Sequence, residues 1–211
     1  MGLEQREAEI DGNALVERVE SIKGRLQTSI TNLLHSQGVR MISGSATLAG
    51  PHEVVVEGPS GRESLHADAI LIGTGSRPRI PDWCTPDGDR ILTTRDCYPP
   101  KVMPEHIAVI GSGVTGVEFA HMFSSMGCKV TLVVSRQQAL PGKDPEVAAV
   151  LEDDFLRRGV VLLKGARAIG IDKADDAGSG PGVIVRCDDG RVVKATHAVL
   201  AIGSVPNTDG I

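Results

Sequence analysis

Residues 106–135, HIAVIGSGVTGVEFAHMFSSMGCKVTLVVS, constrain the fold of this chain more than any other segment. A short apolar strand is followed by a glycine-rich turn, an apolar helix, a further glycine and a second apolar strand. Two parallel strands need a crossover connection of this kind, because a tight turn can join only antiparallel neighbours. The sequence therefore predicts a βαβ unit and an α/β fold with a parallel sheet.

The turn GSGVTG places Gly111, Gly113 and Gly116 in GxGxxG spacing. In such a loop the first glycine allows the tight turn, the second lets the backbone approach a pyrophosphate, and the third lets helix and strand pack closely. The N-terminus of the helix then faces the phosphates. A tight turn without a ligand is the alternative, but the agreement of strand, loop, helix and second strand favours dinucleotide binding.

The end of the second strand bears on the choice of cofactor. An acid there would hold the ribose 2′-hydroxyl of NAD, but the strand ends in Val134, Ser135 and Arg136. A guanidinium suits a 2′-phosphate, which favours NADP(H) or tolerance of both cofactors; a solvated surface arginine is the alternative. Glu118 is expected in the first helical turn, either interacting with the helix N-terminus or contacting ribose or nicotinamide.

Composition excludes several classes of protein. The 211 residues carry a net charge of -5, which does not indicate a nucleic-acid surface. No apolar run approaches the roughly 18 residues of a membrane span, and the charged start MGLEQREAEI resembles neither a signal peptide nor a myristoylation site. We expect a cytoplasmic protein without a metal site, with its four cysteines as reduced, partly buried thiols, because none has CxxC spacing.

The region before the βαβ unit has a different organisation. Apolar residues at steps of three or four predict a long helix over about residues 12–37, with Asp11 as N-cap and Gly38 after its end. Strands are predicted at 39–42, 53–58 and within 61–73. Six of the 12 prolines fall in residues 77–104, which predicts an extended linker.

Two segments of the chain resemble each other. GRESLHADAILIGTGSRP, residues 61–78, and GRVVKATHAVLAIGSVPN, residues 190–207, share Gly-Arg, a short strand, an apolar strand that begins at alanine, and a closing Gly-Ser with proline nearby. Internal similarity often marks repeated units, although two similar hairpins would also produce it. The second segment has a glycine loop upstream, at Gly111, and the first has none in this chain.

Three motifs in this order resemble the FAD-dependent pyridine nucleotide-disulfide oxidoreductases: LIGTGSRPRIP, the segment RILTTRDCYPPKVMPEHIAVIGSGVTGVEFAHMF, and AVLAIGSVPNTDG. Within the family the chain looks closest to the branch of soluble pyridine nucleotide transhydrogenases, NAD(P)H-quinone reductases and dihydrolipoamide dehydrogenases. The resemblance implies a Rossmann-like NAD(P) domain at 105–211, a linker at 99–104, and the C-terminal part of an FAD domain at 1–98, made of the long helix and the β-rich patch.

The resemblance also implies cofactor contacts. Those expected for NAD(P)H are Gly111, Ser112, Gly113, Val114, Thr115, Gly116, Glu118, Ser135, Arg136, Ala168 and Gly203. Those expected for FAD are Ala46, Thr74, Gly75 and Ser76. The family's FAD glycine loop, its CxxxxC disulfide and its C-terminal dimerisation domain are absent. We therefore expect an internal fragment of a homodimeric parent, inactive by itself.

Two functions follow from these patterns. The first is part of a flavoprotein oxidoreductase that binds NAD(P)H and passes hydride to FAD, then to a second nicotinamide nucleotide, a quinone or a disulfide. The second is a non-catalytic NAD(P)-binding module. No catalytic acid or base is predicted. A short-chain dehydrogenase would need Tyr-x-x-x-Lys after the glycine loop, and the only tyrosine, Tyr98, precedes it. A methyltransferase, which usually has an acid after the second strand, is disfavoured but not excluded.

Overall fold

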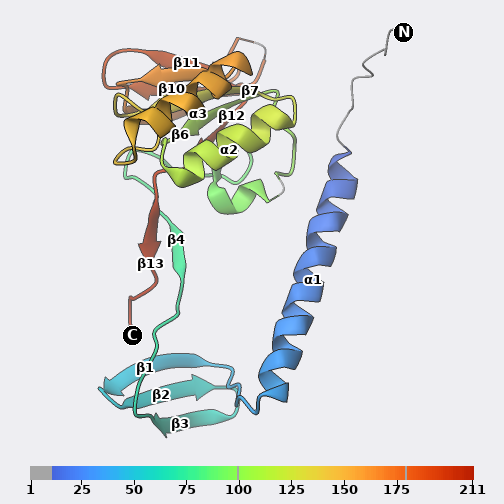
Figure 1. The fold of residues 1–211 in the computed structure, drawn as a ribbon, viewed down its shortest axis with the longest axis vertical. Coiled ribbons are helices and arrows are strands. Elements are labelled where there is room, and N and C mark those ends of the chain that lie inside the picture. The colour runs from blue at the N-terminus through green and yellow to red at the C-terminus, as the bar shows by residue number, and fades with distance from the viewer. Residues whose placement is uncertain (1–10, 99, 179) are drawn as a thin grey trace. The chain divides into compact units, whose positions relative to one another are not determined.

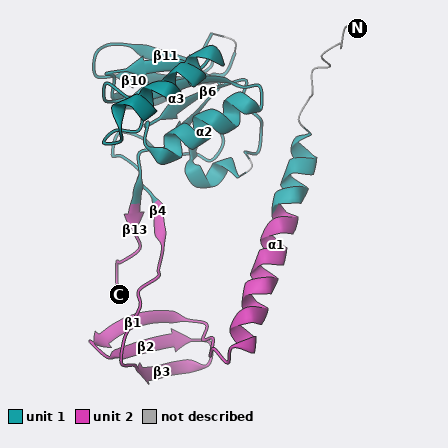
Figure 2. Ribbon diagram, viewed as in Figure 1, with its two compact units in different colours: residues 1–19, 78–204 teal, residues 20–77, 205–211 magenta. Residues whose placement is uncertain are grey.

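A computed structural model describes residues 11–98, 100–178 and 180–211 of the chain (Figure 1). The chain divides into two compact units (Figure 2). The first unit holds residues 78–204 together with the N-terminal stretch up to Val19, and the second holds residues 20–77 and 205–211. The predictions about the N-terminal ten residues lie outside the described part of the chain.

The elements follow in chain order. They are α1 (Gly12–Ser36), β1 (Ser45–Gly50), β2 (Glu53–Gly58), β3 (Gly61–His66), β4 (Ser76–Pro78), β5 (Ile91–Thr93), the 3₁₀ turn η1 (Thr94–Cys97), β6 (His106–Ile110), α2 (Val114–Ser125), β7 (Lys129–Val134), α3 (Pro145–Arg157), β8 (Val161–Lys164), β9 (Ala168–Ala174), β10 (Gly182–Cys187), β11 (Val192–Ala195), β12 (His197–Leu200) and β13 (Ser204–Pro206).

The first unit is built on a five-stranded sheet in the order β5-β12-β6-β7-β8. All four neighbouring pairs are parallel. Helix α2 connects β6 to β7 and α3 connects β7 to β8, as helical crossovers between parallel strands require. The predicted α/β fold with a parallel sheet is therefore confirmed. The strand order of this sheet reverses at β6, whose two neighbours are the next strand in sequence, β7, and the last strand of this sheet in sequence, β12.

The strands of this sheet are mostly apolar, because side chains pack on both of its faces. In β6, Ile107 and Val109 belong to a cluster with Phe119, Phe123 and other side chains of the helical layer. The alternating residues of the same strand, Ala108 and Ile110, belong to a second cluster that includes side chains of β9, β10 and β11. These three strands form an antiparallel sheet. The period-two alternation of a strand thus serves two hydrophobic layers.

Two strand predictions differ from the structure, and the strand β9 was not predicted. β9 was not expected, because its sequence AIGIDKA includes a glycine and two charged residues. The strand predicted at 39–42 is wrong, since these residues follow the end of α1 in an exposed segment without ladder pairing. Residues 69–73 form no strand either, and Leu71 there is 96% exposed. An apolar run becomes a strand only where a partner strand accepts its hydrogen bonds.

The proline-rich region 77–104 is more ordered than a linker. β5 lies at the edge of the parallel sheet beside β12. One carboxylate oxygen of Asp87 accepts the backbone N–H groups of residues 89, 90 and 91. Burial raises the pKa of Asp87, but the hydrogen bond from Lys173 and those three N–H groups outweigh burial and hold the pKa well below its usual range. The boundaries predicted at 98 and 105 remain a prediction, and Pro99 lies outside the described residues.

Helix α1 begins and ends as predicted. The Asp11 carboxylate accepts the N–H groups of residues 13 and 14, as an N-cap does. Gly38 follows the helix with a φ of 71°, the left-handed conformation that glycine adopts at no steric cost. The apolar stripe is exposed at Leu26, Ile30 and Leu33.

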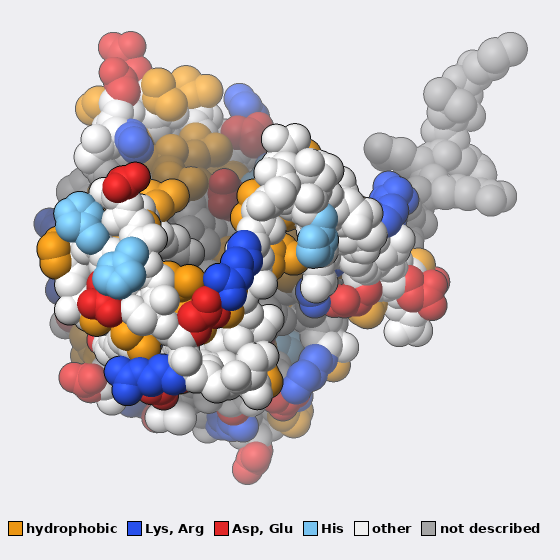
Figure 3. Space-filling model, turned by 90° about the horizontal axis from the view of Figure 1, so that it is seen from below, with side chains coloured by type: hydrophobic (Ala, Val, Ile, Leu, Met, Phe, Trp, Pro, Cys, Tyr) orange, Lys and Arg blue, Asp and Glu red, His pale blue; other side chains and the backbone are white. Residues whose placement is uncertain are grey.

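The second unit contains an antiparallel sheet in the order β1-β2-β3. Arg40, in the segment between α1 and β1, forms an ion pair of 2.7 Å with Glu63 of β3. Basic and acidic side chains lie side by side on the face that Figure 3 shows. β4 pairs with β13 in a separate two-stranded ribbon.

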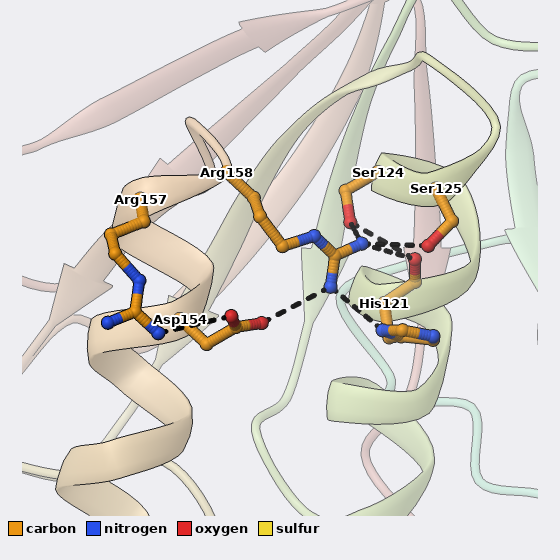
Figure 4. A network of polar contacts seen from close by, with 6 residues as sticks. All are labelled: His121, Ser124, Ser125, Asp154, Arg157 and Arg158. Carbon is orange, nitrogen blue, oxygen red and sulfur yellow. Dashed lines mark hydrogen bonds and ion pairs between the residues drawn. The ribbon is translucent and has the colours of Figure 1, made fainter.

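One arginine joins α2 and α3 (Figure 4). Arg158, just after α3, donates to the hydroxyl oxygens of Ser124 and Ser125 at 2.6 and 2.7 Å, and to the carbonyl oxygen of His121 at 3.2 Å. It also pairs with Asp154 one turn earlier, at 3.5 Å. A further contact of 2.8 Å joins Arg158 to Nδ1 of the His121 ring. The three residues that it contacts on α2 belong to the last two turns of that helix, where a positive charge is favourable.

Removing this guanidinium should destabilise the first unit. We expect Arg158→Ala to cost about 1–2 kcal/mol of unfolding free energy, because several hydrogen bonds from one charged group, whose side chain is 27% exposed, are lost together. Arg157→Ala is the matched control, since its side chain is 72% exposed and makes one surface ion pair. Urea unfolding of both variants tests the expectation; equal losses would contradict it.

Candidate functional site

The glycine loop lies between the end of β6 and the start of α2. Gly111 has a φ of 105°, and its N–H donates to the carbonyl oxygen of Val133 in the neighbouring strand at 3.2 Å. A Cβ atom at Gly111 would overlap the carbonyl oxygen of Ala201, which follows β12. The first glycine is thus required both by its backbone conformation and by the close passage of the adjacent chain.

The other two glycines of the loop meet opposite surroundings. A Cβ atom at Gly116 would overlap the carbonyl group of Gly111, so the helix packs directly on the loop. Gly113 has no atom within 4 Å of the place where a Cβ would be, and its φ is −68°. Its missing side chain therefore serves neither packing nor conformation; it leaves the loop surface open.

Gly113 is also the N-cap residue of α2, and no side chain caps the helix there. The first N–H groups of a helix have no partner within the helix, and they need a side chain, water or ligand. Val114 is exposed, Thr115 is half-buried, and Ser112 beneath them is buried and accepts the N–H of Leu140 through its carbonyl oxygen at 2.7 Å. This open, uncapped helix end has the geometry of an anion site.

Ser135 and Arg136 lie exposed immediately after β7. Two backbone hydrogen bonds connect this turn to the one after β8. The N–H of Gly165 donates to the carbonyl oxygen of Arg136 at 3.0 Å, and that of Ala166 to Val134 at 3.2 Å. The two turns therefore lie next to each other at the carboxyl edge of the sheet, where ligands of open α/β sheets bind.

A cavity of about 250 Å³ opens at this edge. Its lining includes Gly111, Ser135 and Ala168, three of the residues predicted to contact NAD(P)H. Ala168 is buried at the start of β9. Gly203, a fourth predicted residue, adjoins the lining residue Ile202, has a φ of 96°, and accepts the N–H of Arg79 at 2.9 Å.

The position of Glu118 differs from its prediction. α2 begins at Val114, within the segment GSGVTG, so Glu118 lies in the second turn and the first turn contains no acidic residue. Its charge is instead felt by Tyr98, whose pKa is raised first by burial and then by Glu118. The ring of Tyr98 packs on Phe119 with centroids 5.3 Å apart. An interaction of Glu118 with the helix N-terminus is therefore not its role.

Several lining residues of the cavity were not predicted from the sequence. Trp83 and Arg167 are the two of these with the largest polar or aromatic side chains. Trp83 lies in the proline-rich region, whose sequence pattern predicted only a linker and no contact with the nucleotide site. Arg167 directly precedes the predicted contact Ala168, and its charge next to that position was the available signal.

The four residues predicted to contact FAD lie in the second unit. Ala46 is exposed in β1, opposite Val56. The hydroxyl of Thr74 donates to the carbonyl oxygen of Asn207 at 2.6 Å, and the Asn207 N–H donates to that of Gly75 at 3.0 Å. Ser76 begins β4. Two cavities of this unit, beside residues 40–43 and beside residues 66–68, are lined by other residues.

Comparison with known proteins decides the family. The profile described as "Pyridine nucleotide-disulphide oxidoreductase" matches residues 3–211. The chain belongs to this family. An NAD(P)H dehydrogenase (quinone) of Mycobacterium tuberculosis strain H37Rv is 41% identical over 201 residues, covering 92% of the chain and 40% of the relative. A dihydrolipoyl dehydrogenase of Zymomonas mobilis is 33% identical over 213 residues, covering 100% of the chain and 45% of the relative.

The structural comparison agrees with this assignment. The crystal structure of LpdA from Mycobacterium tuberculosis superimposes with a TM-score of 0.84 at 38% identity, covering 96% of the chain and 45% of LpdA. A third relative by sequence, a soluble pyridine nucleotide transhydrogenase of Photorhabdus laumondii, is 32% identical over 200 residues, covering 92% of the chain and 41% of the relative. The chain thus spans less than half the length of these oxidoreductases.

The predicted family and fold class are therefore confirmed, and FAD and NAD(P)H are the cofactors expected of the family. The individual cofactor contacts remain predictions. All four cysteines are buried and unpaired, and burial raises the pKa of Cys97 to about 12. Within the described residues no helix has the length and apolar character of a membrane span, and no cluster of three metal-ligating side chains is found.

Proposed function

We propose that the first unit binds NAD(P)H and belongs to a flavoprotein oxidoreductase in which hydride passes from the nicotinamide to FAD. The observation that carries this proposal is the open Gly113 at the uncapped N-terminus of α2, beside an apolar cavity. Backbone N–H groups at that helix end suit a pyrophosphate. The bound flavin and nicotinamide would supply the redox chemistry, and the chain would supply binding and orientation.

Each predicted contact is proposed to hold a part of the nucleotide, and for Glu118 this part is the ribose or the nicotinamide. Residues 111–116 would hold the pyrophosphate through the loop and the helix end. Ser135 and Arg136 would hold the ribose at the end of β7, and the backbone of Ala168 would lie near the adenine. Gly203 would leave room for the chain to pass the cofactor. The electron acceptor is proposed as a class only: a second nicotinamide nucleotide, a quinone or a disulfide.

The second unit would contribute part of the FAD site through Ala46, Thr74, Gly75 and Ser76. The hydrogen bonds of Thr74 and Gly75 with Asn207 hold this segment in place. The parent is proposed to be a cytoplasmic homodimer, as the resemblance implies. A non-catalytic NAD(P)-binding module is the second candidate, and the full exposure of Leu71 beside the proposed FAD contacts favours it.

Binding of nucleotide can be tested directly, because the chain has a single tryptophan and it lines the cavity. We expect NADPH to quench the fluorescence of Trp83 with a saturable dissociation constant. Flavin absorbance near stoichiometry in the purified chain would support the flavoprotein. A colourless chain that still binds NADPH would support the module. A chain that binds neither nucleotide would contradict the proposal.

Arg136 should matter for NADPH more than for NADH. We expect Arg136→Ala to weaken NADPH binding by about tenfold, because a charge-assisted contact to the 2′-phosphate is lost. Arg157→Ala, an exposed arginine on α3, is the control. An unchanged dissociation constant for NADPH in the Arg136 variant would refute this role.

A further inference from the structure

Arg167 is a second positive charge at the proposed ribose end of the cavity. The cavity is otherwise lined by uncharged residues: Pro81, Trp83, Ile110, Gly111, Val133, Ser135, Ala166, Ala168 and Ile202. No carboxylate belongs to this lining, although the Asp188 carboxylate accepts the backbone N–H of Arg167. A guanidinium on an apolar cavity suits an anionic group of the ligand.

The fold brings Arg167 and Arg136 to neighbouring positions. Val134 pairs with Lys164 at the ends of β7 and β8. Beyond these strands, the hydrogen bonds from Gly165 to Arg136 and from Ala166 to Val134 continue the contact between the two turns. The two arginines therefore belong to turns that are hydrogen-bonded to each other, and Ser135, which precedes Arg136, lines the same cavity as Arg167.

The backbone of Arg167 is fixed while its side chain is exposed. Its N–H donates to the Asp188 carboxylate at 2.9 Å, and its carbonyl oxygen accepts the Asp188 N–H at 2.9 Å. The neighbouring Arg191 is held by Asp189 and by the carbonyl oxygen of Lys164. Among the described residues, no ion pair is found for the guanidinium of Arg167. Its charge is thus positioned without being neutralised.

We propose that Arg167 acts with Arg136 to bind the 2′-phosphate of NADP(H), and that this pair makes the site selective for NADP(H) over NAD(H). This inference rests on the NAD(P)H site proposed above and adds the preference of that site for NADP(H). Two guanidinium groups on adjacent turns can share the oxygens of one phosphate. A single arginine at the end of β7 would allow both cofactors; two arginines and no acid favour the phosphorylated one.

The test measures dissociation constants of the whole chain for NADPH, NADH, 2′,5′-ADP and 5′-AMP, by Trp83 fluorescence and calorimetry. We expect Arg167→Ala to weaken NADPH and 2′,5′-ADP by about tenfold, and to change NADH and 5′-AMP less than about twofold. Arg167→Lys should retain part of the preference, because it keeps the charge and loses the planar fork. Arg157→Ala serves again as the control.

The outcomes separate this inference from the proposed function. Equal weakening of NADH and NADPH would mean that Arg167 contacts the adenine or another shared group, which overturns the inference alone. Equal affinity of the unmodified chain for both cofactors would also overturn it alone. Failure to bind any of the four nucleotides would overturn the proposed function. Raising the ionic strength should weaken NADPH binding more than NADH binding.

Discussion

Alanine at position 116 should destabilise the first unit strongly and abolish nucleotide binding, whereas alanine at position 113 should leave the fold intact and weaken binding alone. Both residues are glycines of the same loop, and only their surroundings differ. A Cβ at Gly116 would overlap the backbone of Gly111, and a Cβ at Gly113 would meet nothing within 4 Å. The pair therefore separates a packing requirement from a ligand requirement.

Two opposing contributions decide whether Gly116→Ala raises or lowers the unfolding free energy. Alanine is favoured over glycine in a helix interior by about 1 kcal/mol. Overpacking against atoms that cannot move typically costs about 1–3 kcal/mol and sometimes more. The atoms that the new methyl group would meet here are backbone atoms of Gly111, which cannot rotate away as a flexible side chain would. We expect a net loss of about 2 kcal/mol or more for Gly116→Ala.

Gly113→Ala should affect nucleotide binding rather than packing. Its backbone is in a conformation open to any residue, with a φ of −68°, although alanine is a poorer N-cap than glycine. We expect a change in unfolding free energy below about 1 kcal/mol. The methyl group would occupy the open surface that the pyrophosphate is proposed to approach, so NADPH binding should weaken by at least about tenfold.

Urea unfolding followed by Trp83 fluorescence reports the first unit, and NADPH titration reports the site. The expectation fails at Gly116 if Gly116→Ala is as stable as the unmodified chain. It fails at Gly113 if the variant folds and binds NADPH with unchanged affinity, because the open space would then serve no ligand.

The sequence predicted those elements whose partners lie nearby in the chain. β6, α2 and β7 follow one another, and alternation and glycine spacing sufficed to place them. β9 was not predicted, because it is stabilised by pairing with β10 (Gly182–Cys187) rather than by its own composition. The position of Glu118 was missed by one turn, since the helix begins immediately after Gly113. Local patterns do not contain such tertiary information.

The candidate site shows the same limit. Gly111, Ser135 and Ala168 were predicted, and they come together around one cavity. Trp83 and Arg167 were not, because nothing local to their segments indicates that distant turns meet at the edge of the sheet. The apolar segment at 69–73 gave the opposite error: its composition favours a strand, but the structure provides no pairing for it.

Leu71 and Leu200 occupy equivalent places in the two similar segments, and they should respond very differently to truncation. With Ala69 aligned on Ala198, the two leucines coincide. Leu200 is 1% exposed in β12, between β5 and β6, and Leu71 is 96% exposed. We expect Leu200→Ala to cost about 2–5 kcal/mol, as deletions in a packed core do. Leu71→Ala should change stability by less than about 0.5 kcal/mol.

Unfolding followed by circular dichroism, at several protein concentrations, measures both variants, and hydrogen exchange adds a local readout. Amides of 198–200 should be protected and those of 70–73 should exchange fast, because only the former lie in a ladder. A cost above about 1 kcal/mol for Leu71→Ala, or protection at 70–73, would show that the segment is packed in solution. If that protection rose with protein concentration, a second copy of the chain would be the partner, because only intermolecular pairing depends on concentration.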